Sequence, residues 1–360
     1  MLKKIVFIHL LNDYSGSPKV LSQIVRNEVL NNSNIYLYTS KDDGFLSNIT
    51  KNHFNFFYKR SNNKFFTLCT YILSQMDLFF KILKYKKEDM IYINTLLPFG
   101  AAMAARFKGC EIIYHIHETS IKPSVLKRFL RYVVSKTASK VIFVSNDLKS
   151  KESFENIKDE VIHNALEHNF LETASHYEYK YLHHDKFIVT MICSLKDYKG
   201  IPEFISICKK LEEQKDISFR LILNADQIEI DTYFNYDLPD NIEIFSRQKD
   251  LTKFYSNSSL VLNLSRVDQW VETFGLTIVE ALAYGVPIIC PPVGGPIEIV
   301  ESDKEGYLIS SYDIGKISNK ILELSRDEDT CLRLSANGKE KVKSFSEKVF
   351  LEKIEKVIYE

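Results

Sequence analysis

Two glutamates stand in the stretch of this sequence whose residue types and spacing best suit chemistry. The stretch runs from Glu272 to Val300 and reads ETFGLTIVEALAYGVPIICPPVGGPIEIV. Glu272 follows an apolar segment that predicts a strand, and the residues from Leu276 onward predict a helix that contains Glu280. Unpaired backbone amides at the start of a helix, together with the helix dipole, favour a diphosphate group. We therefore expect this turn to bind an anion between two carboxylates.

The small residues of the turn support the same interpretation. Gly275 precedes the predicted helix and lets the backbone approach a ligand closely. The amides expected to contact the phosphates are those of Phe274, Gly275, Leu276 and Thr277. Glu280 lies roughly 5–8 Å further along the helix axis, which suits the hydroxyl pair of a ribose. An ordinary strand–helix–strand core would explain the apolar residues of the stretch, but not its glutamates and glycine together.

Three further segments place polar residues directly after predicted strands. CSLKDYKGIPEF contains Lys199, whose ammonium group suits a phosphate, although a solvated loop lysine is the alternative. NDYSGSPKVL forms a small-residue loop that opens a helix, and its candidate residues are Ser15, Gly16 and Ser17. YHIHETS contains His117 and Glu118, and its two-residue spacing puts His115 and His117 on one face of the strand.

The order of the elements explains why these residues gather at strand ends. Short, often continuous apolar segments alternate with helical patterns, which predicts an α/β fold with doubly wound parallel sheets. The pattern is interrupted by polar residues 163–185 and then resumes, so we expect two domains. The predicted strands are Lys4–Leu10, Ile35–Thr39, Met90–Asn94, Glu111–His115, Lys140–Val144, Phe187–Ile192, Phe219–Leu223, Ile242–Phe245, Leu260–Leu264 and Pro287–Cys290. The predicted helices are Lys19–Asn31, Thr67–Lys86, Ser124–Ser139, Pro202–Gln214, Leu251–Ser256, Leu276–Tyr284 and one or two within Lys339–Glu360.

The stretch Glu272–Val300 resembles the donor-site signature of family 4 glycosyltransferases. That signature has two glutamates separated by seven residues with Phe-Gly-Leu between them, then EA-x-A-x-G-x-P and a glycine pair. The resemblance covers nearly the whole chain and implies the GT-B fold, two Rossmann-like domains with parallel sheets facing a central cleft. It implies an acceptor-binding domain at 1–170, a nucleotide-sugar-binding domain at 185–342, and a helix at 343–360 that packs back toward the N-terminal domain.

The resemblance also implies the reaction and the residues that carry it. A sugar would pass from a nucleoside-diphosphate sugar to a saccharide acceptor with retention of configuration and without a cofactor or metal ion. The implied catalytic residues are His117, Lys199 and Glu272. The implied donor-binding residues are Gly16, Ser194, Lys199, Phe274, Gly275, Leu276, Thr277 and Glu280. The implied acceptor-binding residues are Ser15, Ser17 and Glu118, and Asn164 would lie at the hinge.

This chain departs from the family pattern at two positions. Ser194 stands where the family usually has a phosphate-binding arginine, and Cys193 stands where it has a glycine. Lys196 or Arg266 would be the candidates to replace the missing cation. The insert Asp268–Trp270 before Glu272 is expected to shape the choice of sugar, which the sequence does not reveal beyond a hexosyl or deoxyhexosyl group.

Composition narrows the class of protein. The formal net charge is +0, so no overall field favours nucleic acid as a partner. The six cysteines are scattered without a CxxC pair, which favours reduced thiols in the cytoplasm. The acidic run Arg326–Asp329 more simply caps a helix than binds a metal, because acidic residues favour helix starts. The N-terminal apolar run predicts a core strand rather than a signal peptide, and no apolar stretch approaches the ~20 residues of a membrane span.

The acceptor and the membrane remain open at this stage. The basic amphipathic segment Lys122–Lys140 and the aromatic segment Phe54–Lys87 suit either two ordinary core-facing helices or peripheral attachment to an anionic membrane. Attachment would suit a lipid-linked acceptor in bacterial surface polysaccharide synthesis, such as capsule or O-antigen. A nucleotide-sugar epimerase of the same fold and a non-catalytic sugar- or nucleotide-binding module are the alternatives to a transferase.

Overall fold

The computed structural model describes residues 3–27, 30, 34–61 and 63–360 of the chain. The chain divides into two compact units. The N-terminal unit comprises residues 1–164 and 348–360, and the C-terminal unit comprises residues 165–347. The first division therefore falls directly after Asn164, earlier than the expected limit of 170, and the last falls later than the expected 343.

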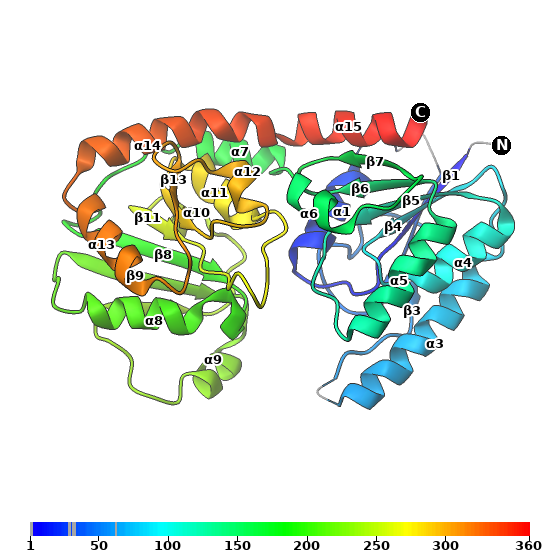
Figure 1. Cartoon of the computed structure of the whole chain (residues 1–360), viewed down its shortest axis with the longest axis horizontal. Helices are drawn as coiled ribbons and strands as arrows, with labels where there is room; N and C mark the ends of the chain where they lie inside the picture. The colour runs from blue at the N-terminus through cyan, green and yellow to red at the C-terminus, as the bar shows by residue number, and fades with distance from the viewer. Residues whose placement is uncertain (1–2, 28–29, 31–33, 62) are drawn as a thin grey trace. The chain divides into compact units, whose positions relative to one another are not determined.

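The N-terminal unit is built on a seven-stranded parallel sheet with the strand order β3-β2-β1-β4-β5-β6-β7 (Figure 1). Its strands are β1 (Lys4–Ile8), β2 (Asn34–Ser40), β3 (His53–Phe56), β4 (Met90–Asn94), β5 (Glu111–Ile116), β6 (Lys140–Phe143) and β7 (Lys158–Val161). All five residues of β4 are buried, as expected for a strand that is covered on both faces. The chain order reverses between β1 and β4, and ligands of doubly wound sheets bind beyond the strand ends at such a point.

Helices cover both faces of this sheet. They are α1 (Gly16–Arg26), α3 (Lys64–Ile82), α4 (Phe99–Lys108), α5 (Ser124–Thr137), α6 (Asn146–Glu152) and most of α15 (Glu347–Tyr359). The C-terminal helix α15 is held in the unit by two long-range hydrogen bonds. Asn27 Nδ2 donates to Glu355 Oε1 at 2.7 Å, and Lys140 Nζ donates to the carbonyl oxygen of Val357 at 2.9 Å.

The C-terminal unit contains a second parallel sheet, with the order β10-β9-β8-β11-β12-β13 (Figure 1). Its strands are β8 (Phe187–Cys193), β9 (Ile217–Leu223), β10 (Ile242–Phe245), β11 (Leu260–Leu262), β12 (Ile288–Cys290) and β13 (Gly306–Leu308). Its helices are α7 (His168–Ser175), α8 (Ile201–Lys210), α9 (Gln227–Tyr233), α10 (Thr252–Tyr255), α11 (Leu276–Ala283), α12 (Pro296–Ile299), α13 (Ile314–Leu324) and α14 (Glu328–Lys341). The apolar faces of β8, β9 and α8 form its core. Both units are therefore Rossmann-like, as predicted.

Several expected elements differ in extent. The polar connection 163–185 contains the short helix α7, which its apolar residues were too few to indicate. Strands β3, β7 and β13 were not predicted, because they are only three or four residues long and lie at or near sheet edges. The helix expected at Lys19–Asn31 is described as Gly16–Arg26, and Asn31 lies outside the described residues.

The acidic run Arg326–Asp329 and the six cysteines were also interpreted from the sequence. Asp327 accepts a hydrogen bond from the backbone amide of Thr330 at 2.9 Å, which confirms that the acidic run caps a helix, here α14. All six cysteines are free thiols, and four of them are buried.

Helix α3 contradicts the prediction that no apolar stretch approaches the length of a membrane span. Among the described residues it is one helix of 19 residues that is long and apolar enough to cross a membrane by length and composition, with a mean hydropathy of 1.2. The prediction missed it because polar residues such as Thr70, Ser74 and Gln75 interrupt the apolar run. Only a third of its most apolar window is buried in the protein.

Candidate donor-binding and catalytic site

The candidate site of the C-terminal unit centres on an ion pair between Lys199 and Glu272. The Lys199 Nζ atom lies 2.7 Å from Glu272 Oε2, and Ser265 Oγ donates to the same oxygen at 3.1 Å. Burial opposes ionisation of Glu272, but the charge of Lys199 and hydrogen bonds from Lys199, Ser265 and Asn263 outweigh it. The pKa of Glu272 is therefore held below its ordinary value, and the pair is ionised.

A glycine explains how two distant loops bring this pair together. Lys199 ends a short 3₁₀ turn (Asp197–Lys199), and Gly200 follows it with a φ of 87°. A Cβ atom at Gly200 would lie 2.2 Å from the carbonyl oxygen of Leu264. Only glycine allows this approach, so the Lys-Gly dipeptide sets the lysine beside the loop that carries Glu272.

The glycine pair Gly294–Gly295 supports the other side of the same loop. Gly295 N donates to the carbonyl oxygen of Glu272 at 2.8 Å. A Cβ atom at Gly294 would meet that carbonyl oxygen at 2.3 Å, and one at Gly295 would meet the backbone of Phe274. The glycines therefore act as a backbone support for the carboxylate, a function that their turn signal alone did not reveal.

Helix α11 begins where the sequence predicted its anion-binding amides. Gly275 precedes it with a φ of 108°, and the first helical hydrogen bond runs from Ile278 N to Gly275 O. The amides of Leu276 and Thr277 therefore come before the helical hydrogen-bond pattern starts. The Phe274 ring is buried against Phe345 and fixes the chain just before the helix.

Glu280 lies one turn into α11 and is only 4% exposed. Tyr255 donates from its hydroxyl group to Glu280 Oε2 at 2.8 Å. A buried carboxylate needs such a partner, and the tyrosine holds one of its oxygens in place. The sequence did not indicate Tyr255, which lies in α10, a four-residue helix far from the motif.

The segment around Ser194, which lacks the usual arginine, makes other contacts. Burial raises the pKa of Cys193 to about 12, so its thiol is neutral beside the charged pair. Arg266, one expected substitute, donates from Nε to Glu203 Oε1 at 2.7 Å. Its charge is thus already committed to a largely buried carboxylate, whereas Lys196 is exposed. Ser194 lies at the end of β8 with its carbonyl oxygen bound by Lys196 N.

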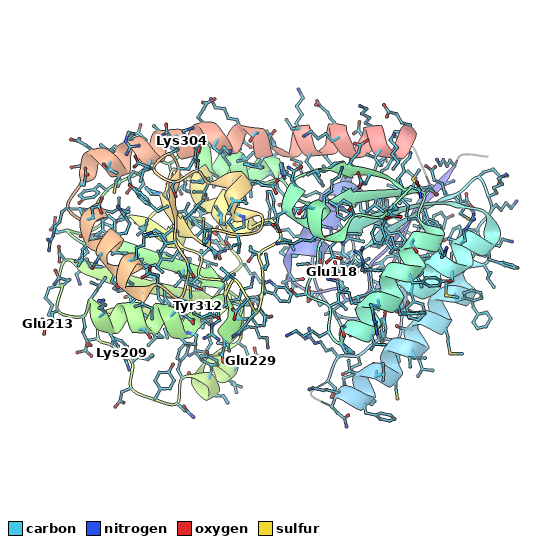
Figure 2. All side chains as sticks on the ribbon, viewed as in Figure 1. Glu118, Lys209, Glu213, Glu229, Lys304 and Tyr312 are labelled. Carbon is cyan, nitrogen blue, oxygen red and sulfur yellow. The ribbon has the colours of Figure 1, made fainter. Side chains whose placement is uncertain are left out.

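The insert Asp268–Trp270 folds over the lysine. The Trp270 ring stacks on Tyr198 with ring centroids 5.0 Å apart, and Lys199 Nζ lies 5.6 Å from the Trp270 centroid. Asp268 accepts a hydrogen bond from the Tyr312 hydroxyl at 2.6 Å, and Figure 2 labels Tyr312. The stacked rings of Trp270 and Tyr198 therefore lie beside the Lys199–Glu272 ion pair.

The N-terminal unit carries the other predicted residues, at the carboxyl ends of β1, β4 and β5. Asn94, which the sequence did not single out, links its parts. His117 Nε2 donates to Asn94 Oδ1 at 2.9 Å, and Asn94 Nδ2 donates to the carbonyl oxygen of Ser17 at 3.2 Å. Ser15 and Gly16 precede Ser17 at the start of α1. The loop and the histidine expected at the site are therefore brought together.

The histidines of this cluster are uncharged at neutral pH. Burial, followed by the nearby His115 and His9, holds the pKa of His117 well below its ordinary value. The His115 and His117 ring centroids are 4.2 Å apart, which confirms that the two share a face. A neutral His117 offers hydrogen bonds rather than a positive charge to a ligand.

Glu118 completes the N-terminal set (Figure 2). Its Oε1 accepts from Leu96 N at 3.0 Å and its Oε2 accepts from His117 N at 3.2 Å. Burial raises the pKa of Glu118 to about 7, because backbone hydrogen bonds compensate only part of the desolvation. This carboxyl group therefore changes charge near neutral pH.

A raised pKa predicts the direction in which Glu118 changes stability with pH. The protonated form is favoured in the folded state, so its contribution is complete below the ordinary value of 4.5 and is lost as the pH rises through about 7. Glu118→Gln cannot ionise. From about pH 5 to about pH 8, the free energy of unfolding of this variant should rise relative to the wild type by about 2 kcal/mol. Urea denaturation of both proteins at the two pH values measures this difference. A difference that is the same at both pH values would contradict the raised pKa of Glu118.

Within residues 3–27, 30, 34–61 and 63–360, no group of three His, Cys, Asp or Glu side chains is placed to hold a metal ion.

The chain is similar in sequence to known glycosyltransferases. Residues 178–341 match the family described as Glycosyl transferases group 1. An uncharacterized glycosyltransferase of Methanocaldococcus jannaschii is 26% identical over 288 residues, 77% of each chain. Sucrose-phosphate synthase 4 of Arabidopsis thaliana is 25% identical over 45% of this chain, which spans only 16% of that plant protein.

Solved structures share the fold over almost the full length. HepE of Anabaena, solved in complex with UDP-glucose, superposes with a TM-score of 0.79 at 19% identity and covers 99% of both chains. The two Rossmann-like units thus form the GT-B fold. The domain matched at residues 178–341 is that of a glycosyltransferase.

Proposed function

We propose that the chain is a retaining, family 4 glycosyltransferase that moves a sugar from a nucleoside-diphosphate sugar to a saccharide acceptor. The observation that carries the proposal is the Lys199–Glu272 pair beside the first amides of α11. A lysine and helix-start amides supply positive charge for a diphosphate. Glu272 is then positioned to accept hydrogen bonds from sugar hydroxyls, and Glu280 to accept them from the ribose.

The proposed mechanism relies on charge stabilisation rather than on a protein nucleophile. As the bond from the sugar to the diphosphate breaks, negative charge grows on the leaving oxygen, and Lys199 with the Phe274–Thr277 amides stabilises it. The leaving diphosphate helps to remove the proton of the attacking acceptor hydroxyl. Orientation of donor and acceptor supplies the remaining acceleration.

The N-terminal set serves the sugar and the acceptor in this proposal. Neutral His117 hydrogen-bonds the sugar being transferred, with Asn94 fixing its ring. Gly16 lets the loop lie close to the donor, while Ser15, Ser17 and Glu118 contact the acceptor. Ser194 contacts the donor phosphates as a hydroxyl in place of the usual arginine.

The proposed choice of donor follows from the stacked rings of Trp270 and Tyr198. HepE was solved with UDP-glucose, which supports a nucleotide sugar as the donor here. The Trp270 ring stacked on Tyr198 lies beside Lys199 and limits the space around the sugar, and a hexosyl or deoxyhexosyl group suits it. The proposed acceptor is a lipid-linked saccharide in bacterial surface polysaccharide synthesis, and the proposed location is the cytoplasm.

Product analysis tests the proposal. A panel of nucleotide sugars is first screened for a rise in the thermal unfolding midpoint, and each hit is incubated with saccharide acceptors. We expect a free nucleoside diphosphate only when an acceptor is present, and NMR of the product should show the donor's anomeric configuration. Epimerised sugar formed without an acceptor would indicate an epimerase. Binding without any product over the acceptor panel would indicate a non-catalytic module, and an inverted product would overturn retention.

A further inference from the structure

Helix α3 of the N-terminal unit exposes many large apolar side chains and buries several polar ones, unlike an ordinary amphipathic helix. Its buried side chains are Thr70, Tyr71, Ser74, Gln75, Leu78 and Ile82. Its exposed side chains include Phe65, Leu68, Ile72, Leu73, Met76 and Phe80, which are 48–74% exposed. Large apolar side chains therefore point outward, while hydroxyl and amide groups point inward.

The buried polar groups fix the helix in this rotation. Tyr71 donates from its hydroxyl group to the carbonyl oxygen of Leu97 at 2.7 Å, and Gln75 Oε1 accepts from Gly100 N at 3.0 Å. A Cβ atom at Gly100 would lie 2.0 Å from the carbonyl oxygen of Gln75, so the helices α3 and α4 touch backbone to backbone. Turning the apolar face inward would break these bonds and leave buried polar groups unpaired.

Helices α4 and α5 extend the exposed apolar surface. The three helices lie side by side (Figure 1), α3 against α4 and α4 against α5. On α4, Met103 and Phe107 are 46% and 79% exposed, and on α5, Val125, Phe129 and Tyr132 are 43–63% exposed. Contiguous apolar surface of this kind on a soluble protein marks a site of interaction.

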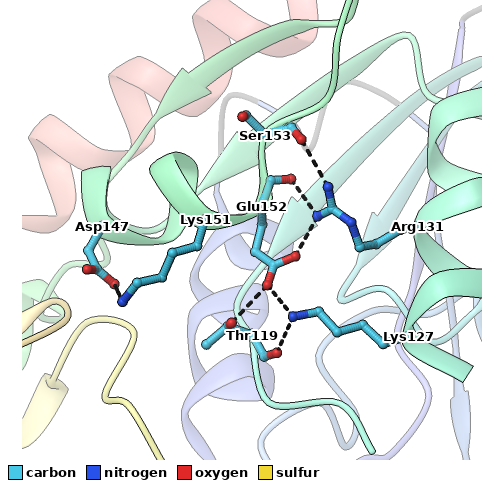
Figure 3. A network of polar contacts seen from close by, with 7 residues as sticks. All are labelled: Thr119, Lys127, Arg131, Asp147, Lys151, Glu152 and Ser153. Atoms are coloured by element: carbon cyan, nitrogen blue, oxygen red, sulfur yellow. Dashed lines mark hydrogen bonds and ion pairs between the residues drawn. The ribbon is translucent and has the colours of Figure 1, made fainter. Parts of the chain in front are cut away.

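A buried carboxylate orients α5 (Figure 3). Lys127 Nζ and Arg131 Nη1 each lie 2.5 Å from an oxygen of Glu152, which is 2% exposed. These two cations therefore point into the protein. Arg128 and Phe129 are exposed and face the solvent instead.

The charge of this surface differs sharply from that of the whole chain. Helices α3, α4 and α5 carry eight Lys and Arg residues, two of which (Lys127 and Arg131) pair with Glu152, and one acidic residue, Asp77. The whole chain has 47 of each sign. Arg106, Lys108, Arg128 and Lys136 are exposed among the apolar side chains. Arg106 and Lys136 also line a hollow of about 840 Å³ between α4, α5 and the segment before β7.

We propose that the exposed faces of α3, α4 and α5, here called the α3–α5 face, dock on an anionic membrane surface. The apolar side chains enter the boundary between headgroups and acyl chains, and the cations meet lipid phosphates. Charge complementarity selects this occupant over a second copy of the chain, since a symmetric contact would bring like charges together. Because one side of α3 is tied to α4, the helix lies along the surface and does not cross the bilayer. This inference concerns binding alone and does not depend on sugar transfer.

Vesicle flotation of the full chain tests the α3–α5 face. At low salt, we expect it to float with phosphatidylcholine vesicles that contain phosphatidylglycerol, and not with phosphatidylcholine alone. Phe65→Ser with Phe80→Ser should weaken binding at least about tenfold. Arg106→Gln with Arg128→Gln should weaken it about fivefold for each cation removed. The matched controls on the C-terminal unit are Ile228→Ser, at a side chain 77% exposed, and Lys209→Gln, at an exposed lysine (Figure 2).

Three outcomes would overturn the proposal. These are absence of binding to anionic vesicles at low salt, equal binding of the control and face variants, or a dimer that the Phe65→Ser, Phe80→Ser variant converts to a monomer. The substituted side chains are exposed, so circular dichroism should show unchanged folding. Should the phenylalanine variant misfold, the arginine variant and the loss of binding at high salt decide the matter. Transfer to a water-soluble acceptor is measured in parallel and should be the same in all variants.

Discussion

Lys199→Met should lower kcat by about a hundredfold or more, with a smaller rise in the donor KM. Methionine keeps much of the aliphatic length beside Trp270 but removes the charge that the leaving diphosphate requires. The lysine acts most strongly in the transition state, where negative charge on the leaving group is greatest, so the loss falls mainly on kcat. Steady-state kinetics at saturating acceptor measure the effect.

The matched control for this variant is Lys196→Met. Lys196 lies three residues earlier on the same loop and is exposed, whereas Lys199 contacts Glu272 at 2.7 Å. A general effect of loop charge, or a phosphate contact from Lys196 in place of the missing arginine, would make the two variants similar, while the proposed role of Lys199 predicts a near-normal Lys196 variant. Without Lys199, burial acts on Glu272 with less opposition, so the pKa of Glu272 should rise. A Lys199 variant with normal kcat would reject the role in catalysis.

Glu280→Ala should raise the donor KM about tenfold or more, because a charged acceptor for the ribose hydroxyls is lost. The carboxylate is 4% exposed and already bonded to Tyr255, so the substitution also leaves the tyrosine hydroxyl without this partner. That second effect should lower the free energy of unfolding by about 1–3 kcal/mol. Donor KM and the thermal midpoint should therefore both change.

Tyr255→Phe separates the two effects. It removes the hydroxyl group that bonds Glu280 and keeps the carboxylate itself. We expect this variant to lose stability with a much smaller rise in the donor KM than Glu280→Ala shows. A Glu280→Ala enzyme with an unchanged donor KM would reject the ribose assignment, whatever its stability.

Local patterns explain the parts of the fold and site that could be predicted. The strand and helix order came from apolar segments of the right length, and the structure confirms two Rossmann-like sheets. The turn before α11 was predictable because Gly275, the amides and Glu280 are neighbours in sequence. The carboxyl ends of parallel strands meet at one edge, which is why residues after separate strands, such as Ser17 and His117, could be grouped.

Contacts between distant segments explain what could not be predicted. Asn94 joins Ser17 to His117, but an asparagine at a strand end has no distinctive signal. The support that Gly295 gives to the Glu272 carbonyl requires the two loops to be placed in space first. The outward apolar face of α3 was hidden for the same reason, because periodicity shows that a stripe exists but not which side packs on the protein.

The path of the chain through its two units also sets the order in which they are completed during translation. Residues 165–347 are continuous and leave the ribosome before α15 does, so the C-terminal unit has all its strands while the N-terminal one still lacks a helix. Phe350, Ile354, Val357 and Ile358 are buried in the finished molecule. Until they emerge, the surface that these side chains later cover stays exposed, which gives chaperones a defined interval in which to bind.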